Sequence, residues 1–424
     1  MKLANKTNSI LPSMLLIAGI FLLAAVISLS IGIPVAQVMK DYNYSVIVIL
    51  IVMELFTNLV VETGIMQFLA KNLAVWSKGR KKRCIIFFGV LMFLISSLLN
   101  NITAVMMILP VIFVLLKAIN ADTKYISVFF AAILALSNTG GAASPIGDFP
   151  AIVIMTSGIT TFTGYLFKAF PLFLITSIIV IIIWCFFVKE KNQSESKRLL
   201  AIELLKSRYK YHRVNKKALI PLIITMVFMF IAWSFVPQSI MPPEIIAVLG
   251  YSIGLAISAW NGIRIKQCVD MKSVLTIASF LLLASVISAS GVLSQVAVFL
   301  ESNITNPKLL LLAVMLITSL ISGLVSAGPA TAAMMPIIIN LCNTSLSGQS
   351  EWVAIAYAAS ICAGSSLFLW SATAGFILSG KIDSAELESN GTKYSWGIKQ
   401  YFKYGLLNYT IQMIIAVVWI MLAI

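Results

Sequence analysis

Charged residues are scarce in this chain of 424 residues: 11% are charged and 60% are hydrophobic. A soluble domain needs roughly a quarter of its residues charged to cover its surface, so this composition excludes a soluble protein. Histidine occurs once, at His212, which excludes a histidine-rich metal site. The five cysteines form no Cys-x-x-Cys pair, and their scattered positions do not predict a disulfide framework.

Long apolar runs take the place of the missing charge, and many have the roughly 20 residues that span a bilayer. The first, from about Ser13 to Ile33, is longer than the core of a signal peptide, so we interpret it as a spanning helix. Further spans are expected at about 44–61, 125–157, 165–188, 218–236, 244–260, 273–290, 351–380 and 404–424. The pattern predicts an all-α polytopic protein of the lipid bilayer with about nine crossings.

Two further apolar stretches, 84–118 and 309–342, are too long for one crossing and barely long enough for two. Each carries polar or helix-breaking residues halfway, at Leu99–Thr103 and at Ser326–Pro329. Lipid offers no hydrogen-bond partner to a broken backbone, so such breaks must be buried in protein or face a water-filled cavity. We therefore predict two re-entrant hairpins in addition to the crossings.

The formal net charge of +15 tests this topology, because cytoplasmic loops of membrane proteins are rich in lysine and arginine. With a cytoplasmic N-terminus, all of the 30 basic residues except Lys40, Lys168 and Lys308 fall on the cytoplasmic side. The charge thus indicates the orientation of a multi-pass protein in a bacterial inner (cytoplasmic) membrane. A nucleic-acid partner is not expected.

The two halves of the chain repeat the same series of motifs with an offset of about 225 residues. Asn100–Pro110 corresponds to Ser326–Pro336, and Gly140–Asp148 corresponds to Gly364–Ala372. In the expected topology one repeat begins outside and the other begins inside. The repeats are therefore inverted, each with one re-entrant hairpin and one broken transmembrane helix.

Five segments follow from this pattern, and the linker between the halves is rich in lysine and arginine. We interpret the linker first as a solvated cytoplasmic connector, with a regulatory or partner-binding role as the alternative. The segments are an N-terminal spanning helix and outer loop at 1–43, a first inverted repeat at 44–188, the basic linker at 189–217, connecting spanning helices at 218–269 and a second inverted repeat at 270–424.

Inverted repeats of this kind are typical of secondary transporters, whose binding sites lie at mid-membrane between discontinuous helices. Broken helices direct half-helix N-termini, which carry partial positive charge, and unwound carbonyl groups into one cavity. There they can replace the hydration shell of an ion.

Three carboxylates fall inside expected spans, where a charge costs at least about 2.5–3.5 kcal/mol and so needs a partner or a role. Asp148 is the strongest candidate for proton coupling, because glycines and prolines interrupt its surroundings from Ser137 to Pro150. That stretch is not expected to form a regular helix. Glu54 could serve proton coupling or structural hydrogen bonding, and Glu62 could serve coupling or merely lie at the cytoplasmic interface.

Neutral polar residues of the hairpin tips and broken helices are the other candidates for substrate or ion contact. Small hydroxyl groups also serve plain helix packing in membranes, and tip residues also cap helices, so these alternatives stay open. The candidates are Asn100, Asn101, Thr103, Asn138, Thr139, Gly141, Ser144, Ser326, Thr331, Ser365, Ser366 and Thr373.

An intramembrane aspartyl protease is the rival from the enzyme class, and it needs a Gly-x-Gly-Asp turn and a second buried aspartate. Here Pro145 occupies the place of the first glycine, and no second aspartate falls inside an expected span. The stretch Gly375–Ile382 nearly spells a phosphate-binding loop, but Ile382 replaces the Mg²⁺-binding hydroxyl residue. We therefore expect a transporter and not an enzyme.

The order of elements and three motifs, Asn100–Pro110, Gly140–Pro150 and Ser365–Thr373, resemble the ion transporter superfamily over roughly residues 44–424. This superfamily includes ArsB-type arsenite permeases, NhaD-type Na⁺/H⁺ antiporters, citrate transporters and divalent anion/Na⁺ symporters. The stretch Gly140–Asp148 is most similar to that of the NhaD-type antiporters.

The resemblance implies that Asp148 exchanges Na⁺ for H⁺, aided by Asn138 and Ser144, with Asn100 as a further Na⁺ contact. It also implies an elevator movement of hairpins and broken helices against a scaffold, within a homodimer. The expected function is alternating-access secondary transport coupled to a cation or proton, with Na⁺/H⁺ antiport first. The alternative is coupled transport of an anion such as arsenite, citrate or another carboxylate. No cofactor is expected beyond a bound Na⁺.

Overall fold

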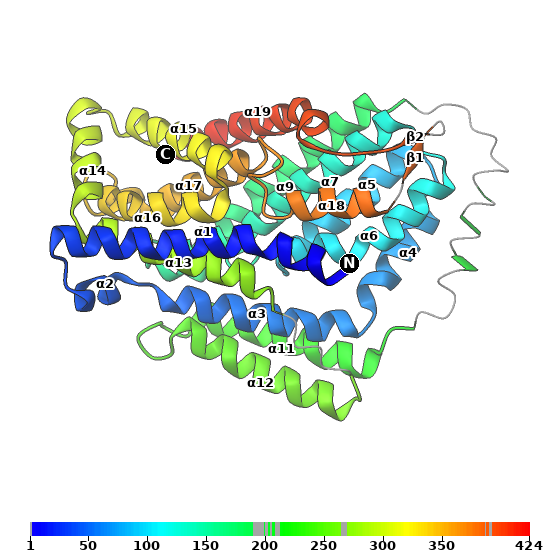
Figure 1. The fold of residues 1–424 in the computed structure, drawn as a ribbon, viewed down its shortest axis with the longest axis horizontal. Helices are drawn as coiled ribbons and strands as arrows, with labels where there is room; N and C mark the ends of the chain where they lie inside the picture. Colours follow the sequence, from blue (N-terminus) through cyan, green and yellow to red (C-terminus); the bar gives the residue numbers. More distant parts are fainter. Residues whose placement is uncertain are drawn as a thin grey trace.

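The computed structural model describes residues 2–189, 199, 202–203, 206–207, 213–263, 269–385, 387–389 and 392–424. Many of the long helices lie side by side, with their axes close to horizontal in Figure 1. Most of the predicted linker 189–217, including His212, lies outside the described residues.

Helices make up nearly all of the described structure. The first half contains α1 (Lys2–Ile31), α2 (Val35–Asp41), α3 (Tyr44–Glu62), α4 (Ile65–Trp76), α5 (Lys81–Ser96), α6 (Asn101–Ala118), α7 (Thr123–Ala143), α8 (Phe149–Thr156) and α9 (Phe162–Phe187). The second half contains α11 (Lys216–Phe235), α12 (Pro243–Trp260), α13 (Met271–Ala289), α14 (Val292–Asn303), α15 (Pro307–Val325), α16 (Ala327–Asn343), the 3₁₀ turn η1 (Ser347–Gln349), α17 (Ser350–Ser365), α18 (Gly375–Ser384) and α19 (Ile398–Ala423). Two short antiparallel strands, β1 (Glu388–Ser389) and β2 (Thr392–Lys393), precede α19.

Ten helices of the described chain are long and apolar enough to cross a membrane. Two of them, α6 and α15, are arms of the predicted hairpins, and the others correspond to predicted crossings. The remaining predicted crossing, 351–380, is divided between the shorter helices α17 and α18. The all-α polytopic class is therefore confirmed.

Each half contains one helical hairpin and one broken helix, as the sequence predicts. The hairpins are α5–α6, which join at residues 97–100, and α15–α16, which join at Ser326. The broken helices are α7–α8, interrupted at 144–148, and α17–α18, interrupted at 366–374. The first break is shorter than expected, because residues 137–143 continue α7 as a regular helix despite their two glycines.

Corresponding elements of the two halves begin in the same way but at opposite ends of the molecule. A glycine with positive φ precedes both amphipathic helices, Gly64 (φ 81°) before α4 and Gly291 (φ 77°) before α14. A residue with a side chain would be strained in that conformation. Figure 1 shows α14, α15 and α16 in the left part of the molecule and α4, α5 and α6 in the right part. This is the arrangement expected of inverted repeats; the exact segment boundaries stay predictions.

Small residues allow the broken helices to lie very close to the hairpins. A Cβ atom added at Gly140 of α7 would lie 2.5 Å from the Phe93 carbonyl oxygen of α5. The equivalent Gly364 of α17 lies equally close to α15, where an added Cβ would lie 2.7 Å from Ser322 Cβ. Because such contacts leave no space for a methyl group, each broken helix and its hairpin pack as one unit.

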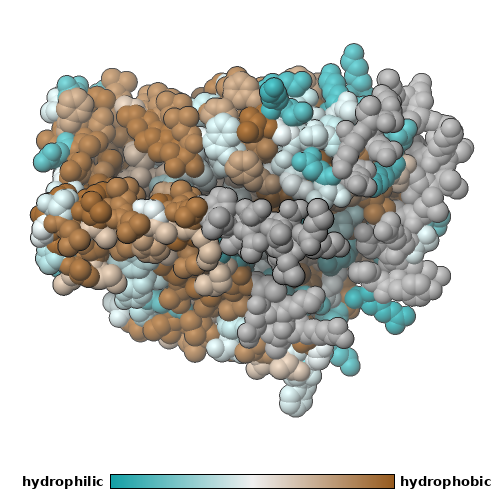
Figure 2. All heavy atoms as spheres, viewed as in Figure 1, coloured by the Kyte–Doolittle hydropathy of each residue, from teal (hydrophilic) through white to brown (hydrophobic). Residues whose placement is uncertain are grey.

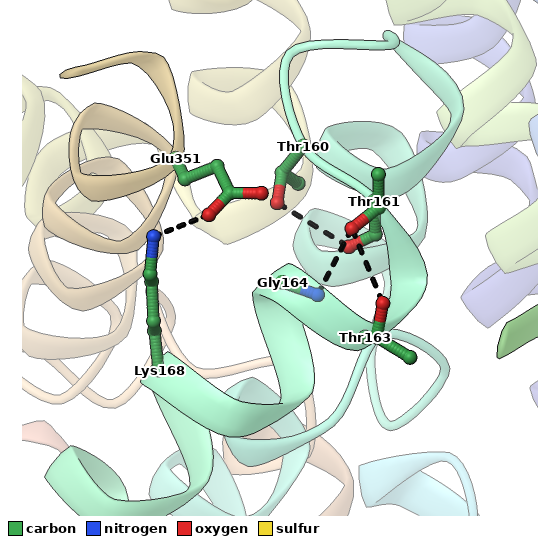
Figure 3. A network of polar contacts seen from close by, with 6 residues as sticks. All are labelled: Thr160, Thr161, Thr163, Gly164, Lys168 and Glu351. Atoms are coloured by element: carbon green, nitrogen blue, oxygen red, sulfur yellow. Dashed lines mark hydrogen bonds and ion pairs between the residues drawn. The ribbon is translucent and has the colours of Figure 1, made fainter. Parts of the chain in front are cut away.

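An ion pair fastens the beginning of each broken helix. Lys81 at the start of α5 pairs with Asp122, which caps α7 by accepting a hydrogen bond from Tyr125 N at 2.8 Å. At the other end Lys168 of α9 pairs with Glu351 in the first turn of α17, and Figure 3 shows the two side chains reaching toward each other. A carboxylate in the first turn also interacts favourably with the helix dipole.

The surface changes character along the long axis. Figure 2 shows mostly hydrophobic residues over the left part of this face, whereas hydrophilic residues are more frequent among the coloured residues toward the right. The N-terminus lies toward the same end in Figure 1. This distribution agrees with the predicted cytoplasmic side, although orientation in a membrane stays a prediction.

Gly140→Ala should reduce stability by about 1–3 kcal/mol, because the new methyl group overpacks the α5–α7 contact. Gly19→Ala in α1 is the matched control, since nothing lies within 4 Å of a Cβ atom there. Thermal unfolding of the purified proteins in detergent measures the difference. Equal midpoints for the two variants would show that the α5–α7 contact is not tight.

Asp122→Asn should reduce stability at neutral pH but not at low pH. Burial raises the pKa of Asp122, but the hydrogen bond and charge of Lys81 and the Tyr125 N–H outweigh burial and hold that pKa below its usual value. The stabilising contribution is therefore complete above about pH 4, the ordinary range of an aspartate, and is lost as the pH falls through the lowered pKa. We expect no more than about 1 kcal/mol, because the Asp122 side chain is 48% exposed and partly screened.

Unfolding midpoints of the wild type and Asp122→Asn at pH 7 and pH 3 test this expectation. Glu203→Gln is the control, because Glu203 pairs with Lys206 at 3.4 Å with a side chain that is 71% exposed. A difference between wild type and Asp122→Asn that stays constant with pH would contradict it.

Candidate functional site

Asp148 lies in the break between α7 and α8 and is buried, with 8% of its surface exposed. Pro145 and Pro150 flank it: Pro145 keeps the preceding Ser144 extended (φ −131°, ψ 155°), and Pro150 lies in the first turn of α8, where its missing N–H is tolerated. Asp148 itself has an extended backbone (φ −149°, ψ 165°), and its Oδ1 accepts a hydrogen bond from Phe149 N at 2.9 Å. The carboxylate therefore caps α8 while it faces the interior of the protein.

Neutral groups from both repeats hold the other carboxylate oxygen. Asn101 at the start of α6 donates from Nδ2 to Asp148 Oδ2 at 2.8 Å. Thr373 in the second broken helix donates from Oγ1 to the same oxygen at 3.4 Å. The first hairpin and both broken helices therefore meet at one carboxylate.

Gly141 leaves the space in which the Asn101 and Asp148 side chains lie against α7. A Cβ atom added there would lie 2.5 Å from Asn101 Oδ1 and 2.9 Å from Asp148 Cβ. Any larger residue at 141 would push the amide and the carboxylate away from α7. The sequence reasoning named Gly141 as part of the site, and the structure places it directly behind the Asn101–Asp148 pair.

Two small cavities of about 10 Å³ each lie against Asp148, and Asp148 is the one residue that lines both. Each has room for about one water molecule or a bare ion. The first, which we call the Tyr165 cavity, is also lined by Tyr165, Asn138 and Cys362 and by Ala327, which belongs to the second hairpin. The second, the Glu54 cavity, includes Asn100 of the first hairpin tip and Glu54 of α3. All four chain breaks thus converge around Asp148.

A second polar group joins the two broken helices next to the Tyr165 cavity. Asn138 of α7 donates from Nδ2 to Ser366 Oγ at 3.0 Å, and Ser366 Oγ donates to Gln412 Oε1 of α19 at 3.2 Å. Asn138 Oδ1 and Asn101 Oδ1 are buried and, within the part of the chain that the structure describes, accept no hydrogen bond. Buried carbonyl oxygens of this kind are the ligands that a hard cation such as Na⁺ prefers.

Several predicted residues make local contacts instead of lining the cavities. Thr139 Oγ1 lies 2.8 Å from Ser177 Oγ of α9, and Ser144 Oγ donates to the Ser97 carbonyl at the first hairpin tip. Thr331 Oγ1 donates to the Ala327 carbonyl one turn earlier in α16, at 2.6 Å. These contacts agree with the alternative that small hydroxyl groups serve helix packing and hydrogen-bond carbonyl groups near the breaks.

The remaining candidates differ in whether they line one of the two cavities beside Asp148. Ser365 lines the Tyr165 cavity and donates to the Cys362 carbonyl at 2.8 Å. Thr103 in the first turn of α6 and Ser326 at the second tip (φ 125°) are half-buried and line neither cavity. Asn100 caps α6 by accepting from Ile102 N at 2.9 Å.

The two further carboxylates differ in position. Glu54 lines its cavity, and its Oε1 accepts a hydrogen bond from Asp270 N at 3.1 Å, so it also ties α3 to the start of α13. Glu62 is the last residue of α3 and lines neither cavity. Both alternatives for Glu54, proton coupling and structural hydrogen bonding, therefore remain open. Glu62 lies at the end of a helix, as its interfacial alternative predicts.

The sequence reasoning missed three residues of the site: Gln412, Cys362 and Tyr165. Gln412 is an amide in the middle of an apolar span, which is itself a detectable signal because such groups need partners in lipid. Tyr165 lines the cavity and donates from its hydroxyl to the Ala142 carbonyl at 2.8 Å, next to the break. No sequence pattern distinguishes this tyrosine or Cys362 from others, because only the packing brings them to Asp148.

The chain is similar to several membrane proteins. A "46 kDa membrane protein" of Mycobacterium leprae is 24% identical over 322 residues, which cover 75% of this chain and 74% of the relative. An uncharacterized transporter of Mycobacterium tuberculosis is 25% identical over 346 residues, covering 80% of this chain and 78% of the relative. The magnetosome protein MamN of Magnetospirillum gryphiswaldense is 22% identical over 367 residues, covering 85% and 81%.

A family match covers most of the chain, from residue 6 to residue 362, and includes Asn101, Asn138 and Asp148. The family is described as citrate transporters, CitMHS, and this confirms the resemblance to the ion transporter superfamily. Since the family and the Mycobacterium tuberculosis relative are described as transporters, the expectation that the chain is not an enzyme is also confirmed, and the aspartyl protease alternative is set aside. Its spanning helices and this match together establish that the chain belongs to the citrate transporter family and is a multi-pass membrane transporter.

Proposed function

We propose that this transporter is coupled to a cation through Asp148, with Na⁺/H⁺ antiport as the first form of that coupling. The observation that carries the proposal is the buried Asp148 carboxylate, whose hydrogen bonds come from the neutral groups of Asn101, Thr373 and the Phe149 backbone. A buried carboxylate without a cationic partner is costly when ionised. Binding either H⁺ or Na⁺ removes that cost, and one carboxylate cannot hold both fully, which supports exchange of one for the other.

The oxygen atoms around Asp148 suit Na⁺. Asn101, which hydrogen-bonds Asp148, carries the buried oxygen Oδ1. Asn138, which lines the Tyr165 cavity, carries a second buried Oδ1. The resemblance also assigns Na⁺ contacts to Asn100 and Ser144, and Asn100 lines the Glu54 cavity. Ser144 is the least direct member of this set, because its hydroxyl donates to the Ser97 carbonyl.

Alternating access would use the two cavities. Asp148 lines both the Tyr165 cavity and the Glu54 cavity, and Thr373 of the opposite repeat donates a long hydrogen bond to it. A small displacement of one repeat against the other could therefore connect Asp148 to one side at a time. We place the protein in the inner membrane with a cytoplasmic N-terminus, and propose a homodimer, on the grounds of charge distribution and resemblance given above.

Transport of a carboxylate anion such as citrate is the second candidate, and the description of the matched family favours it. The buried amide Nε2 of Gln412, which donates no hydrogen bond within the described chain, is a group that such an anion could use. The two cavities against Asp148 are far smaller than a tricarboxylate, so this candidate requires a more open conformation. Arsenite transport rests on the superfamily resemblance alone.

Asp148→Asn should abolish coupled transport, because the amide cannot exchange a proton for Na⁺ but keeps the shape of the side chain. Proteoliposomes loaded with a pH-sensitive dye should show a Na⁺-dependent pH change with the wild type and none with the variant. Gly19→Ala controls for reconstitution. An unchanged Na⁺-dependent signal in Asp148→Asn would remove this residue from the mechanism.

The same vesicles discriminate the two candidates. Uptake of labelled citrate that depends on a proton or Na⁺ gradient, without any Na⁺-dependent pH change in the absence of citrate, would replace antiport with anion symport. A Na⁺-dependent pH change without citrate supports antiport.

Gly141→Ala should weaken transport, because its methyl group would displace Asn101 Oδ1 from behind Asp148. Loss of a hydrogen bond to a charged group costs about 1.5–3 kcal/mol, so we expect a loss of about tenfold or more in apparent ion affinity. The dependence of the pH signal on Na⁺ concentration measures it. The unfolding midpoint should fall no further than that of Gly140→Ala, and an unaltered Na⁺ dependence would contradict the placement of Asn101 in the site.

A further inference from the structure

A pocket remote from Asp148 lies where α5 and α7 begin and α9 ends. It has a volume of about 250 Å³, and Lys81, Asp122, Lys124, Tyr125, Phe187 and Lys189 are among the residues that line it. Ser127 Oγ of α7 and Tyr394 OH lie 2.6 Å apart, which places this end of α7 beside the residue that follows β2, on the right in Figure 1. None of its lining residues takes part in the site around Asp148.

The charge of this pocket is positive. Lys81 is largely buried and belongs to the structure: it pairs with Asp122, and its ammonium nitrogen lies 5.0 Å from the centre of the Tyr125 ring. The Tyr125 hydroxyl donates to the Lys81 carbonyl at 3.0 Å and holds the pair in place. The exposed ammonium groups of Lys124 and Lys189 are then the charges that a ligand in the pocket can reach.

The wall beneath these lysines is apolar and continues along the membrane-facing side of α9. Phe187, Val188 and Val128 line the pocket. Along α9, exposed apolar side chains recur every three or four residues and so form one stripe, which ends at Phe186, next in sequence to Phe187 of the pocket. The stripe consists of Ile175, Ile178, Ile182 and Phe186, and they are 38%, 47%, 49% and 79% exposed.

We propose that this pocket binds the phosphate headgroup of an anionic membrane phospholipid, with Lys124 and Lys189 contacting the phosphate and an acyl chain lying along the α9 stripe. Basic pockets at the ends of membrane helices are suited to such headgroups, because the phosphate lies at the depth where the helices end. The continuous apolar stripe favours a lipid over a free phosphate ion, which would have no use for it. The bound lipid would link the ends of α7 and α9, next to the Lys81–Asp122 pair that fastens the first broken helix.

Native mass spectrometry of the full-length protein in detergent tests the proposal, with phosphatidylglycerol and phosphatidylcholine of the same chains as probes. The wild type should retain phosphatidylglycerol more tightly than phosphatidylcholine. The double variant Lys124→Gln/Lys189→Gln should lose about thirtyfold in phosphatidylglycerol affinity, at about fivefold for each lysine near a charged headgroup. Both lysines are exposed, so the variant should unfold at the same temperature as the wild type when no lipid is added.

The matched control is Lys117→Gln/Lys399→Gln, which removes the same charge from exposed positions on α6 and α19. It should keep the affinity of the wild type. Equal loss in both double variants, equal affinity for the two lipids, or an unchanged affinity in Lys124→Gln/Lys189→Gln would each overturn the proposal. Inorganic phosphate that binds as tightly as the lipid would overturn it as well, because the ligand would then be a free anion. Asp148→Asn should bind the lipid normally, so this test is independent of the proposed coupling.

Discussion

Lipid offers no hydrogen bond to a peptide group, and this constraint decides how the chain can interrupt its helices. At each interruption, neighbouring side chains take over the carbonyl groups that the helix leaves free. Tyr165 donates to the Ala142 carbonyl before the first break at 2.8 Å, and Tyr401 donates to the Ser366 carbonyl in the second at 2.7 Å. Ser371 donates to the Phe368 carbonyl within the same break at 2.7 Å.

Supplying these partners forces the breaks into one place. A break needs polar groups around it, and the other breaks are the main source of polar groups inside an apolar bundle. The second hairpin tip illustrates this, because Ala327 N donates to the Ser371 carbonyl of the second break at 3.3 Å. The first tip does the same with the first break through Asn101 and Asp148. The same arrangement thus supplies hydrogen bonds to the backbone groups at the breaks and assembles the proposed ion site.

Close helix packing is the second requirement, and it is met by small residues at equivalent positions of the two repeats. Gly140 and Gly364 bring α7 and α17 against α5 and α15, and Gly141 leaves space for Asn101 behind Asp148. The ion pairs Lys81–Asp122 and Lys168–Glu351 then hold the outer ends of the two broken helices. The Lys81–Asp122 pair lies within the first repeat, whereas Lys168–Glu351, the 3.0 Å hydrogen bond from Asn138 to Ser366 and the longer one from Thr373 to Asp148 join the two repeats.

Hydropathy was sufficient for the membrane class and most of the spans, because the length of an apolar run is set by the thickness of the bilayer, and the two hairpins also required the helix-breaking residues halfway along their runs. Its embedded carboxylate and the glycines and prolines around it were sufficient to single out Asp148, since each of these residues carries a free-energy cost in a membrane helix. The extent of the first break was not predictable in this way, because packing against α5 keeps 137–143 helical where propensity alone would end the helix. Which polar side chains face Asp148 and which satisfy a nearby carbonyl, as Thr139 and Ser144 do, was decided by the tertiary structure, because helix rotation and long-range packing set those contacts. Gln412 and Tyr165 belong to the site for the same reason: contacts across more than 20 residues of sequence have no local signal.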